Sequence, residues 1–218
     1  METETFLCEL DASIQAALAR IQPSPLAGET DPGVGVPRLL QIALRNELEA
    51  SEEAAVWMAR ERDVEVKLAL ARQCGDEARH YRLIADRLRA LGVDPDTVDP
   101  QAGGPSPMFV HLCGLETTEE RIAAGPYARE ALALARNEAF IELCEGRGDE
   151  LTARLYRETI QPDERHHHEL GRRLLGRLCT SDEARARARA AAERTLTLAG
   201  ELAEIARLRH GLTRLPGC

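Results

Sequence analysis

The feature of this sequence that most constrains its fold is a Glu-x-x-His motif that occurs twice, within residues 76–80 and 163–167. Side chains three positions apart lie on the same face of an α-helix, about one turn from each other. Each motif therefore predicts a helix that presents a carboxylate beside an imidazole, two side-chain types that together bind iron and related metal ions. The pairs are Glu77 with His80, and Glu164 with His167.

The spacing of apolar residues predicts that most of the chain is helical. Leu, Ile, Ala and Val recur at intervals of three to four positions, as on the buried face of an amphipathic helix. Aromatic residues make up only 3% of the chain, which argues against a β-rich fold. The predicted helices span residues 5–21, 37–60, 63–91, 126–145, 149–178 and 181–209.

These segments predict an all-α chain built on an antiparallel four-helix bundle at residues 37–178. The stretch 93–117, rich in Pro and Gly, is long for a connection and fits a crossover between the second and third bundle helices. Residues 1–36 would form an accessory helix followed by a Pro/Gly-rich strap. Residues 179–218 would form a C-terminal helix that packs on the bundle or on a partner subunit, as in a homodimer.

Two further glutamates complete a set of candidate metal ligands. Glu47 and Glu138 each lie on the apolar stripe of a helix that precedes one of the motifs. Four buried carboxylates would repel one another and lose hydration at a high cost unless cations neutralise them. Two divalent ions would in turn need several carboxylates, with imidazoles to complete their coordination. The predicted ligands are Glu47, Glu77, His80, Glu138, Glu164 and His167.

For two other residues, the sequence does not decide whether they belong to the ligand set. Glu142, one helical turn beyond Glu138, is a candidate seventh ligand or catalytic proton carrier, and a solvent-facing carboxylate is the alternative. His168 lies four residues after Glu164 and is a rival to His167. We prefer His167 because it repeats the three-residue spacing of the first motif.

The order Glu, Glu-x-x-His, Glu, Glu-x-x-His resembles the ligand pattern of the ferritin-like superfamily of di-metal carboxylate proteins, over residues 37–178. The form Asp-Glu-x-Arg-His at 76–80 is similar to the motif of bacterial multicomponent monooxygenase hydroxylases and ribonucleotide reductase small subunits. The second motif departs from that form, because Arg165 is shifted by one position. The resemblance therefore supports the fold and the site more than any one activity.

In those families, the aspartate that precedes a ligand glutamate bonds the ligand histidine of the other motif. The resemblance implies that Asp76 orients His167 and that Asp163 orients His80. Such contacts hold an imidazole in one orientation and one protonation form.

The resemblance also implies a function. Such centres hold two iron ions, or Mn/Fe or Mn/Mn pairs, and react with dioxygen or peroxide. We expect oxidation or oxygenation of a small organic substrate, because the accessory helices and the crossover can cover a substrate pocket. Electrons would come from a separate reductase or ferredoxin, since the six widely spaced cysteines form no rubredoxin-like cluster. The alternatives are a ferroxidase or peroxide-scavenging, rubrerythrin-like protein and a non-catalytic metal-binding module.

The charge of the chain argues against some partners. It carries 37 acidic and 28 basic residues, a net charge of −9, so a general nucleic-acid-binding surface is not expected. No apolar run approaches the length of about 18 residues that a membrane span needs, and the first residues do not resemble a secretion signal. We therefore expect a cytoplasmic protein whose cysteines are reduced.

Overall fold

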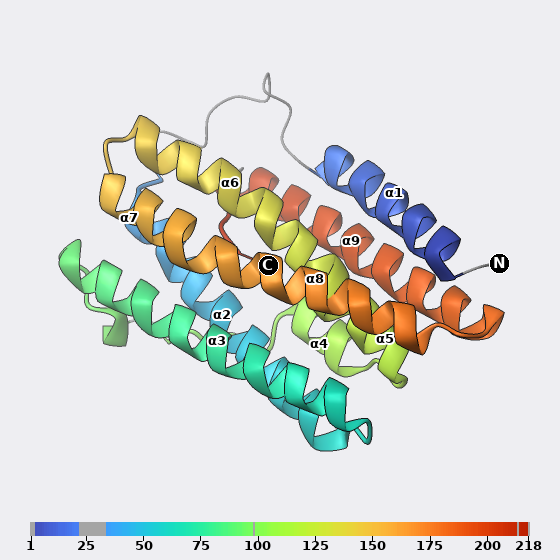
Figure 1. The fold of residues 1–218 in the computed structure, drawn as a ribbon. Coiled ribbons are helices and arrows are strands. Elements are labelled where there is room, and N and C mark those ends of the chain that lie inside the picture. Colours follow the sequence, from blue (N-terminus) through green and yellow to red (C-terminus); the bar gives the residue numbers. More distant parts are fainter. Residues whose placement is uncertain (1–2, 22–33, 98, 213, 218) are drawn as a thin grey trace.

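The computed structural model describes residues 3–21, 34–97, 99–212 and 214–217. These residues are helical apart from short connections, which confirms the predicted all-α class for this part of the chain (Figure 1). The elements are α1 (Thr3–Ile21), α2 (Val36–Arg60), α3 (Val64–Ala90), η1 (Pro95–Thr97), α4 (Pro107–Cys113), α5 (Thr118–Ile122), η2 (Ala123–Arg129), α6 (Glu130–Gly146), α7 (Glu150–Leu155), η3 (Tyr156–Ile160), α8 (Gln161–Leu178) and α9 (Asp182–His210).

Most of the predicted strap, at residues 22–33, lies outside the described residues. Among the residues that are described, no helix combines the length and the apolar character needed to cross a bilayer.

Helices α2 and α3 form an antiparallel pair joined by a connection of three residues. The Asp63 side chain caps α3 by accepting a hydrogen bond from the Val66 backbone N–H at 3.1 Å. The Glu61 carboxylate accepts from the backbone N–H groups of Arg62 and Asp63, at 2.7 and 3.1 Å. These bonds satisfy backbone donors that the start of α3 would otherwise leave unpaired.

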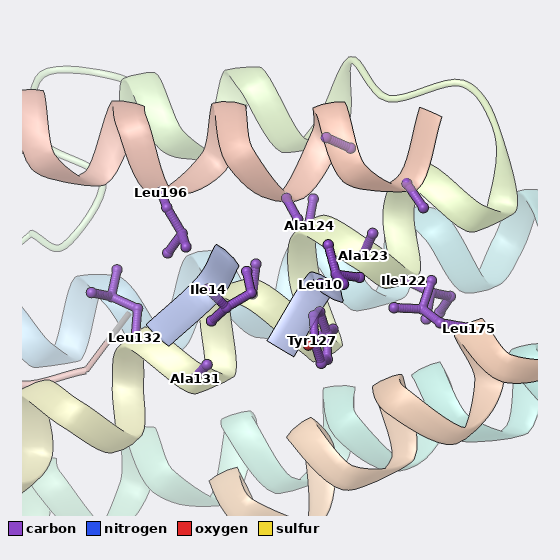
Figure 2. Packing of buried hydrophobic residues seen from close by; sticks show 14 of the residues in the cluster. Leu10, Ile14, Ile122, Ala123, Ala124, Tyr127, Ala131, Leu132, Leu175 and Leu196 are labelled. Atoms are coloured by element: carbon purple, nitrogen blue, oxygen red, sulfur yellow. The ribbon is translucent and has the colours of Figure 1, made fainter. Parts of the chain in front are cut away.

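Helices α1 and α9 lie along the side of the molecule formed by η2, α6 and α8, away from α3 (Figure 1). An apolar cluster joins them to η2 and α8; in Figure 2, Leu10 and Ile14 of α1 lie close to Tyr127 of η2 and Ala131 of α6. A second apolar cluster lies at the other end of the α2–α3 pair and includes Leu40. The Glu-x-x-His motif of α3 falls between the residues that α3 contributes to these two clusters.

The third bundle helix begins earlier than predicted. The expected start was near Pro126, but the chain is helical from Thr118 and passes through a π-helical segment, η2, that contains this proline. A capping box between Thr117 and Glu120 marks the actual start. A proline inside an α-helix removes a hydrogen bond and crowds the carbonyl four residues earlier. The wider π-helical turns accommodate Pro126 without ending the helix.

A second π-helical segment, η3 (Tyr156–Ile160), stands immediately before α8 and its Pro162. The segment 149–178, predicted as one helix, is therefore interrupted by a π turn. η2 ends directly before Glu130, and η3 ends four residues before Glu164. Such π-helical turns are often found at functional sites.

Gly171 of α8 packs against the backbone of η2. A Cβ atom at this position would lie 2.8 Å from Pro126 C and Tyr127 N, and 2.9 Å from Pro126 O. Backbone atoms cannot move aside in the way that the end of a flexible side chain can. The glycine therefore permits the close approach of α8 to η2.

We expect Gly171→Ala to lower the free energy of unfolding by about 1–3 kcal/mol, because the added methyl group overpacks this contact. Gly75→Ala in α3 is the matched control, since a Cβ there meets nothing within 4 Å. Alanine should stabilise that exposed helical position by about 0.5–1 kcal/mol. Urea denaturation of both variants measures the difference. Equal stabilisation of the two would contradict the close packing of α8 on η2.

Candidate metal centre

Two groups of buried glutamate and histidine side chains adjoin each other in the interior. In each group every residue offers one ligand atom, and these atoms lie within 4.8 Å of one another. The groups are Glu47, Glu77, His80 and Glu164, and Glu77, Glu130, Glu164 and His167. Glu77 and Glu164 belong to both groups, so the six residues form one carboxylate–histidine cluster. Four helices supply it: α2, α3, α6 and α8.

Both imidazole rings point Nδ1 into the cluster. His80 Nδ1 lies 3.1 Å from Glu77 Oε2, 3.5 Å from Glu47 Oε2 and 3.7 Å from Glu164 Oε1. His167 Nδ1 lies 3.3 Å from Glu77 Oε1 and 3.6 Å from Glu164 Oε2. The same ring atom of both histidines thus faces the carboxylates and is available as a ligand atom.

The other ring nitrogen of each histidine contacts an aspartate of the opposite motif. His167 Nε2 lies 3.0 Å from Asp76 Oδ2, and His80 Nε2 lies 3.0 Å from Asp163 Oδ2. These are the crossed pairs that the family resemblance implies. An Nε2–H group that donates to the aspartate leaves the Nδ1 lone pair for a metal ion.

The aspartates also contact arginines at the surface. Arg72 Nε donates to Asp76 Oδ2 at 3.3 Å, and Arg79 pairs with Asp163. The hydrogen bond from His167 is the main reason why the pKa of Asp76 is lowered. Asp76 therefore stays charged opposite this histidine at neutral pH.

The unpaired atoms of the cluster fit metal ions. Several of its buried oxygen and nitrogen atoms have no hydrogen-bond partner among the described residues, although burying such atoms unpaired is costly. They are both carboxylate oxygens of Glu47 and of Glu164, Oε1 of Glu77 and Nδ1 of His167. Four carboxylates carry the charge that two divalent cations would balance. The donor set of oxygens and imidazole nitrogens suits iron, manganese and related ions.

The carboxyl groups of the cluster differ in their affinity for protons. Burial, together with the charges of Glu77 and Glu164, raises the pKa of Glu47 to about 8. The pKa of Glu130 is well above its usual range, because of burial and then the charges of Glu164 and Glu77. Burial also opposes ionisation of Glu77, but the close imidazoles of His167 and His80 outweigh it and hold its pKa well below the usual range.

The histidines bind protons more tightly than a free imidazole. Burial favours their neutral form, but the nearby carboxylates of Glu47 and Glu77 outweigh it and raise the pKa of His80 to about 12. The pKa of His167 is raised as well, against the effect of burial, by its hydrogen bond to Asp76 and by the nearby carboxylates of Glu164 and Glu77. Protons would therefore compete with metal ions for these histidines.

Two predicted site residues lie outside the cluster. Glu138 is exposed, and its Oε2 accepts a hydrogen bond from Gln161 Nε2 at 3.5 Å. Glu142 is exposed too, in line with the alternative of a solvent-facing carboxylate. Glu130 takes the place that was predicted for Glu138. The physical reason is helical rotation: Asn137 faces inward, and the next residue points about 100° away.

A signal for Glu130 is present in the sequence. In an antiparallel helix pair, two residues separated from the turn by the same number of positions lie at the same level along the helix axes. Arg62, in the first turn, is 15 residues from both Glu47 and Glu77. Arg147, in the second turn, is 17 residues from both Glu130 and Glu164. Once the structure has placed both turns, this equal spacing favours Glu130 over Glu138.

Buried polar side chains hold this part of α6 in place. Gln73 Nε2 of α3 donates to Glu130 Oε1 at 2.5 Å. The preceding Arg129 forms an ion pair with Glu53 of α2 at 2.5 Å, and both side chains are buried. Sequence reasoning missed both contacts, because each joins residues that are far apart in the chain.

His168 points away from the cluster. Its Nδ1 lies 2.8 Å from the backbone oxygen of Tyr127, and its ring stacks on the Tyr127 ring with centroids 4.9 Å apart. The structure thus brings His167, and not His168, to the other candidate ligands.

The C-terminal segment reaches the cluster at its Glu47 edge. The Gly217 N–H donates to Asn137 Oδ1 at 2.8 Å, and Asn46 Nδ2 donates to Pro216 O at 3.3 Å. Gly217 has φ +75°, and a Cβ atom there would lie 3.5 Å from Glu47 Oε1. Backbone of the C-terminal segment therefore lies directly beside this carboxylate.

We expect Asp76→Asn and Asp163→Asn each to weaken metal binding by about 10–100-fold, because each removes the charged partner of a cluster histidine. Asp86→Asn in α3 is the control, since Asp86 is exposed and pairs with Arg89. Titration of the three variants with Mn²⁺ by calorimetry measures the affinities. Unchanged affinity in both cluster variants would show that the aspartates do not support metal ligands.

Fold and site together define an all-helical protein with a buried carboxylate–histidine cluster that could hold metal ions. No protein-family model, curated protein or solved structure matches this chain. Inferences about its function therefore rest on the residues of the cluster and their surroundings.

Proposed function

We propose that this chain is a di-iron carboxylate protein that activates dioxygen for the oxidation or oxygenation of a small organic substrate. One observation carries the proposal: the two groups of candidate ligands share Glu77 and Glu164. Two carboxylates common to both groups would bridge two neighbouring ions, whereas a single ion would leave one glutamate–histidine pair unused. The arrangement supports the ferritin-like resemblance on which this function rests.

The residues of the chain would have distinct tasks. Glu47 and His80 would bind one ion, Glu130 and His167 the other, and the shared carboxylates both. Two iron ions, when bound, would supply the electrons that reduce dioxygen. The crossed aspartates would hold Nε2–H of each imidazole and so direct Nδ1 at its ion. Electrons for repeated turnover would come from a separate reductase or ferredoxin.

Two observations favour an organic substrate over iron oxidation and storage or peroxide scavenging. The cluster side chains are at most 1% exposed, and the C-terminal segment lies beside Glu47, an arrangement suited to resident ions more than to ions in transit. Glu142, the candidate for an additional carboxylate ligand, is exposed. Manganese-containing pairs would fit the same ligands.

Anaerobic titration with Fe²⁺, followed by exposure to air, tests the proposal. We expect two ions to bind per chain, and dioxygen consumption with an added reductant while the iron content stays at two. Continued accumulation of iron would overturn the proposal in favour of a ferroxidase. Failure to bind iron or manganese at all would reduce the cluster to a structural feature. Glu138→Gln, at an exposed position on the same helix as Glu130, is the control and should bind as the wild type does.

A further inference from the structure

A cavity of about 520 Å³ lies outside the carboxylate–histidine cluster, between α1, α6, α9 and the C-terminal segment. Ligand pockets commonly have volumes of about 300–1,000 Å³. None of the residues that line the cavity belongs to the cluster. The cavity is therefore a separate candidate binding site.

The walls of the cavity are largely apolar. Figure 2 shows Leu196 of α9 and Leu132 of α6 on facing sides of the space between these helices. Ile21 of α1 and the segment that follows α9, through Leu212 and Leu215, add further apolar surface. Such walls favour a ligand whose body is a hydrocarbon chain or ring.

The polar groups around the cavity are mainly guanidinium groups. Among the lining residues that the structure describes, the arginines outnumber the carboxylates by four to one, although the whole chain has a net charge of −9. The arginines are Arg20, Arg136, Arg207 and Arg214. The carboxylate belongs to Glu204, which accepts two hydrogen bonds from Arg207, at 2.6 and 2.8 Å. A net positive charge therefore remains at this cavity.

We propose that the cavity binds a single-chain amphipathic anion, of which a fatty carboxylate is the simplest example. The apolar walls would take the chain, and Arg20 and Arg214 would pair with the anionic head. A guanidinium group offers several N–H donors in a geometry that matches a carboxylate. This inference does not depend on the metal function, because the two sites share no residue.

Calorimetric titration of the full chain with dodecanoate and with the uncharged dodecanol tests the inference. Dodecanoate should bind at one site per chain and at least about tenfold more tightly than dodecanol, which cannot form an ion pair. Equal affinity for the two would overturn the proposal, because the arginines would then not recognise the head group.

Two variants locate the site. Ala139→Trp should abolish binding by filling the cavity, while Ala71→Trp, at an exposed alanine of α3, should have no effect. The double variant Arg20→Gln/Arg214→Gln should bind dodecanoate about tenfold more weakly and dodecanol unchanged. Its control is Arg62→Gln/Arg173→Gln, at two exposed arginines outside the cavity. Unaltered dodecanoate binding by both cavity variants would also overturn the proposal.

The Glu77→Gln variant separates this inference from the proposed function. It should bind dodecanoate as the wild type does, because Glu77 does not line the cavity. Loss of dodecanoate binding in this variant, if the protein is folded by circular dichroism, would contradict an independent site. Loss of metal binding alone concerns only the cluster.

Discussion

Glu77→Gln is expected to remove both metal ions from the protein. The affinity of the variant for each ion should fall by more than about tenfold. Glu77 belongs to both groups of candidate ligands, so its loss affects both ions. It is also the carboxylate whose pKa is lowered by both histidines, and it is therefore ionised and ready to bind. Metal analysis after loading with Fe²⁺ under anaerobic conditions measures the number of ions retained per chain.

Variants of the residues that are not shared provide a graded comparison. Glu47→Gln should weaken the binding of one ion and Glu130→Gln that of the other, since each glutamate belongs to a single group of candidate ligands. Glu130→Gln and Glu138→Gln form the sharpest matched pair, because both lie on α6 and only Glu130 is buried in the cluster. Full metal binding by Glu130→Gln together with loss in Glu138→Gln would overturn the assignment of Glu130.

Binding of two divalent ions at pH 7 is expected to release protons, because the ligands must lose their protons to coordinate metal. In the metal-free protein the raised pKa values of Glu47, Glu130, His80 and His167 keep all four groups largely protonated at this pH. Glu47 and Glu130 are then neutral, and the two histidines carry positive charge. The ions thus replace protons in the core and do not simply add charge to it.

The pH dependence of binding has a definite sign. A group whose pKa is raised holds its proton until the pH exceeds that value, so protons compete with metal more strongly as the pH falls. Affinity should therefore increase with pH, and the dependence should become less steep above about 8, where Glu47 ionises by itself. Calorimetry in buffers of different ionisation enthalpy counts the released protons. A binding enthalpy that is the same in all buffers would contradict the exchange.

The helical elements and much of the cluster could be predicted because they depend on local spacing. Three-residue spacing places Glu77 beside His80, and Glu164 beside His167, in any sequence that forms a helix. The apolar periodicity predicted a helix at 63–91, and the structure has α3 at Val64–Ala90. The inward direction of Glu47 also followed from its place on an apolar stripe.

Contacts between distant segments could not be predicted in the same way. The choice between Glu130 and Glu138 depends on the height and rotation of α6 relative to its neighbours, and local apolar spacing allowed either residue. The π-helical turns beside Pro126 and Pro162 change that rotation, because they add residues to a turn. The contact of Gly217 with Asn137 joins residues that are 80 positions apart.

The sequence by itself determined the all-α class and the two Glu-x-x-His pairs, because helical periodicity alone decides which side chains share a face. Only the tertiary structure decided that Glu130 completes the cluster and that His168 contacts Tyr127. It also decided that a cavity with four arginines among its described lining residues lies between α1, α6 and α9. These features depend on how whole helices are rotated and stacked. That arrangement is set by the packing of many side chains together and not by the spacing of any one motif.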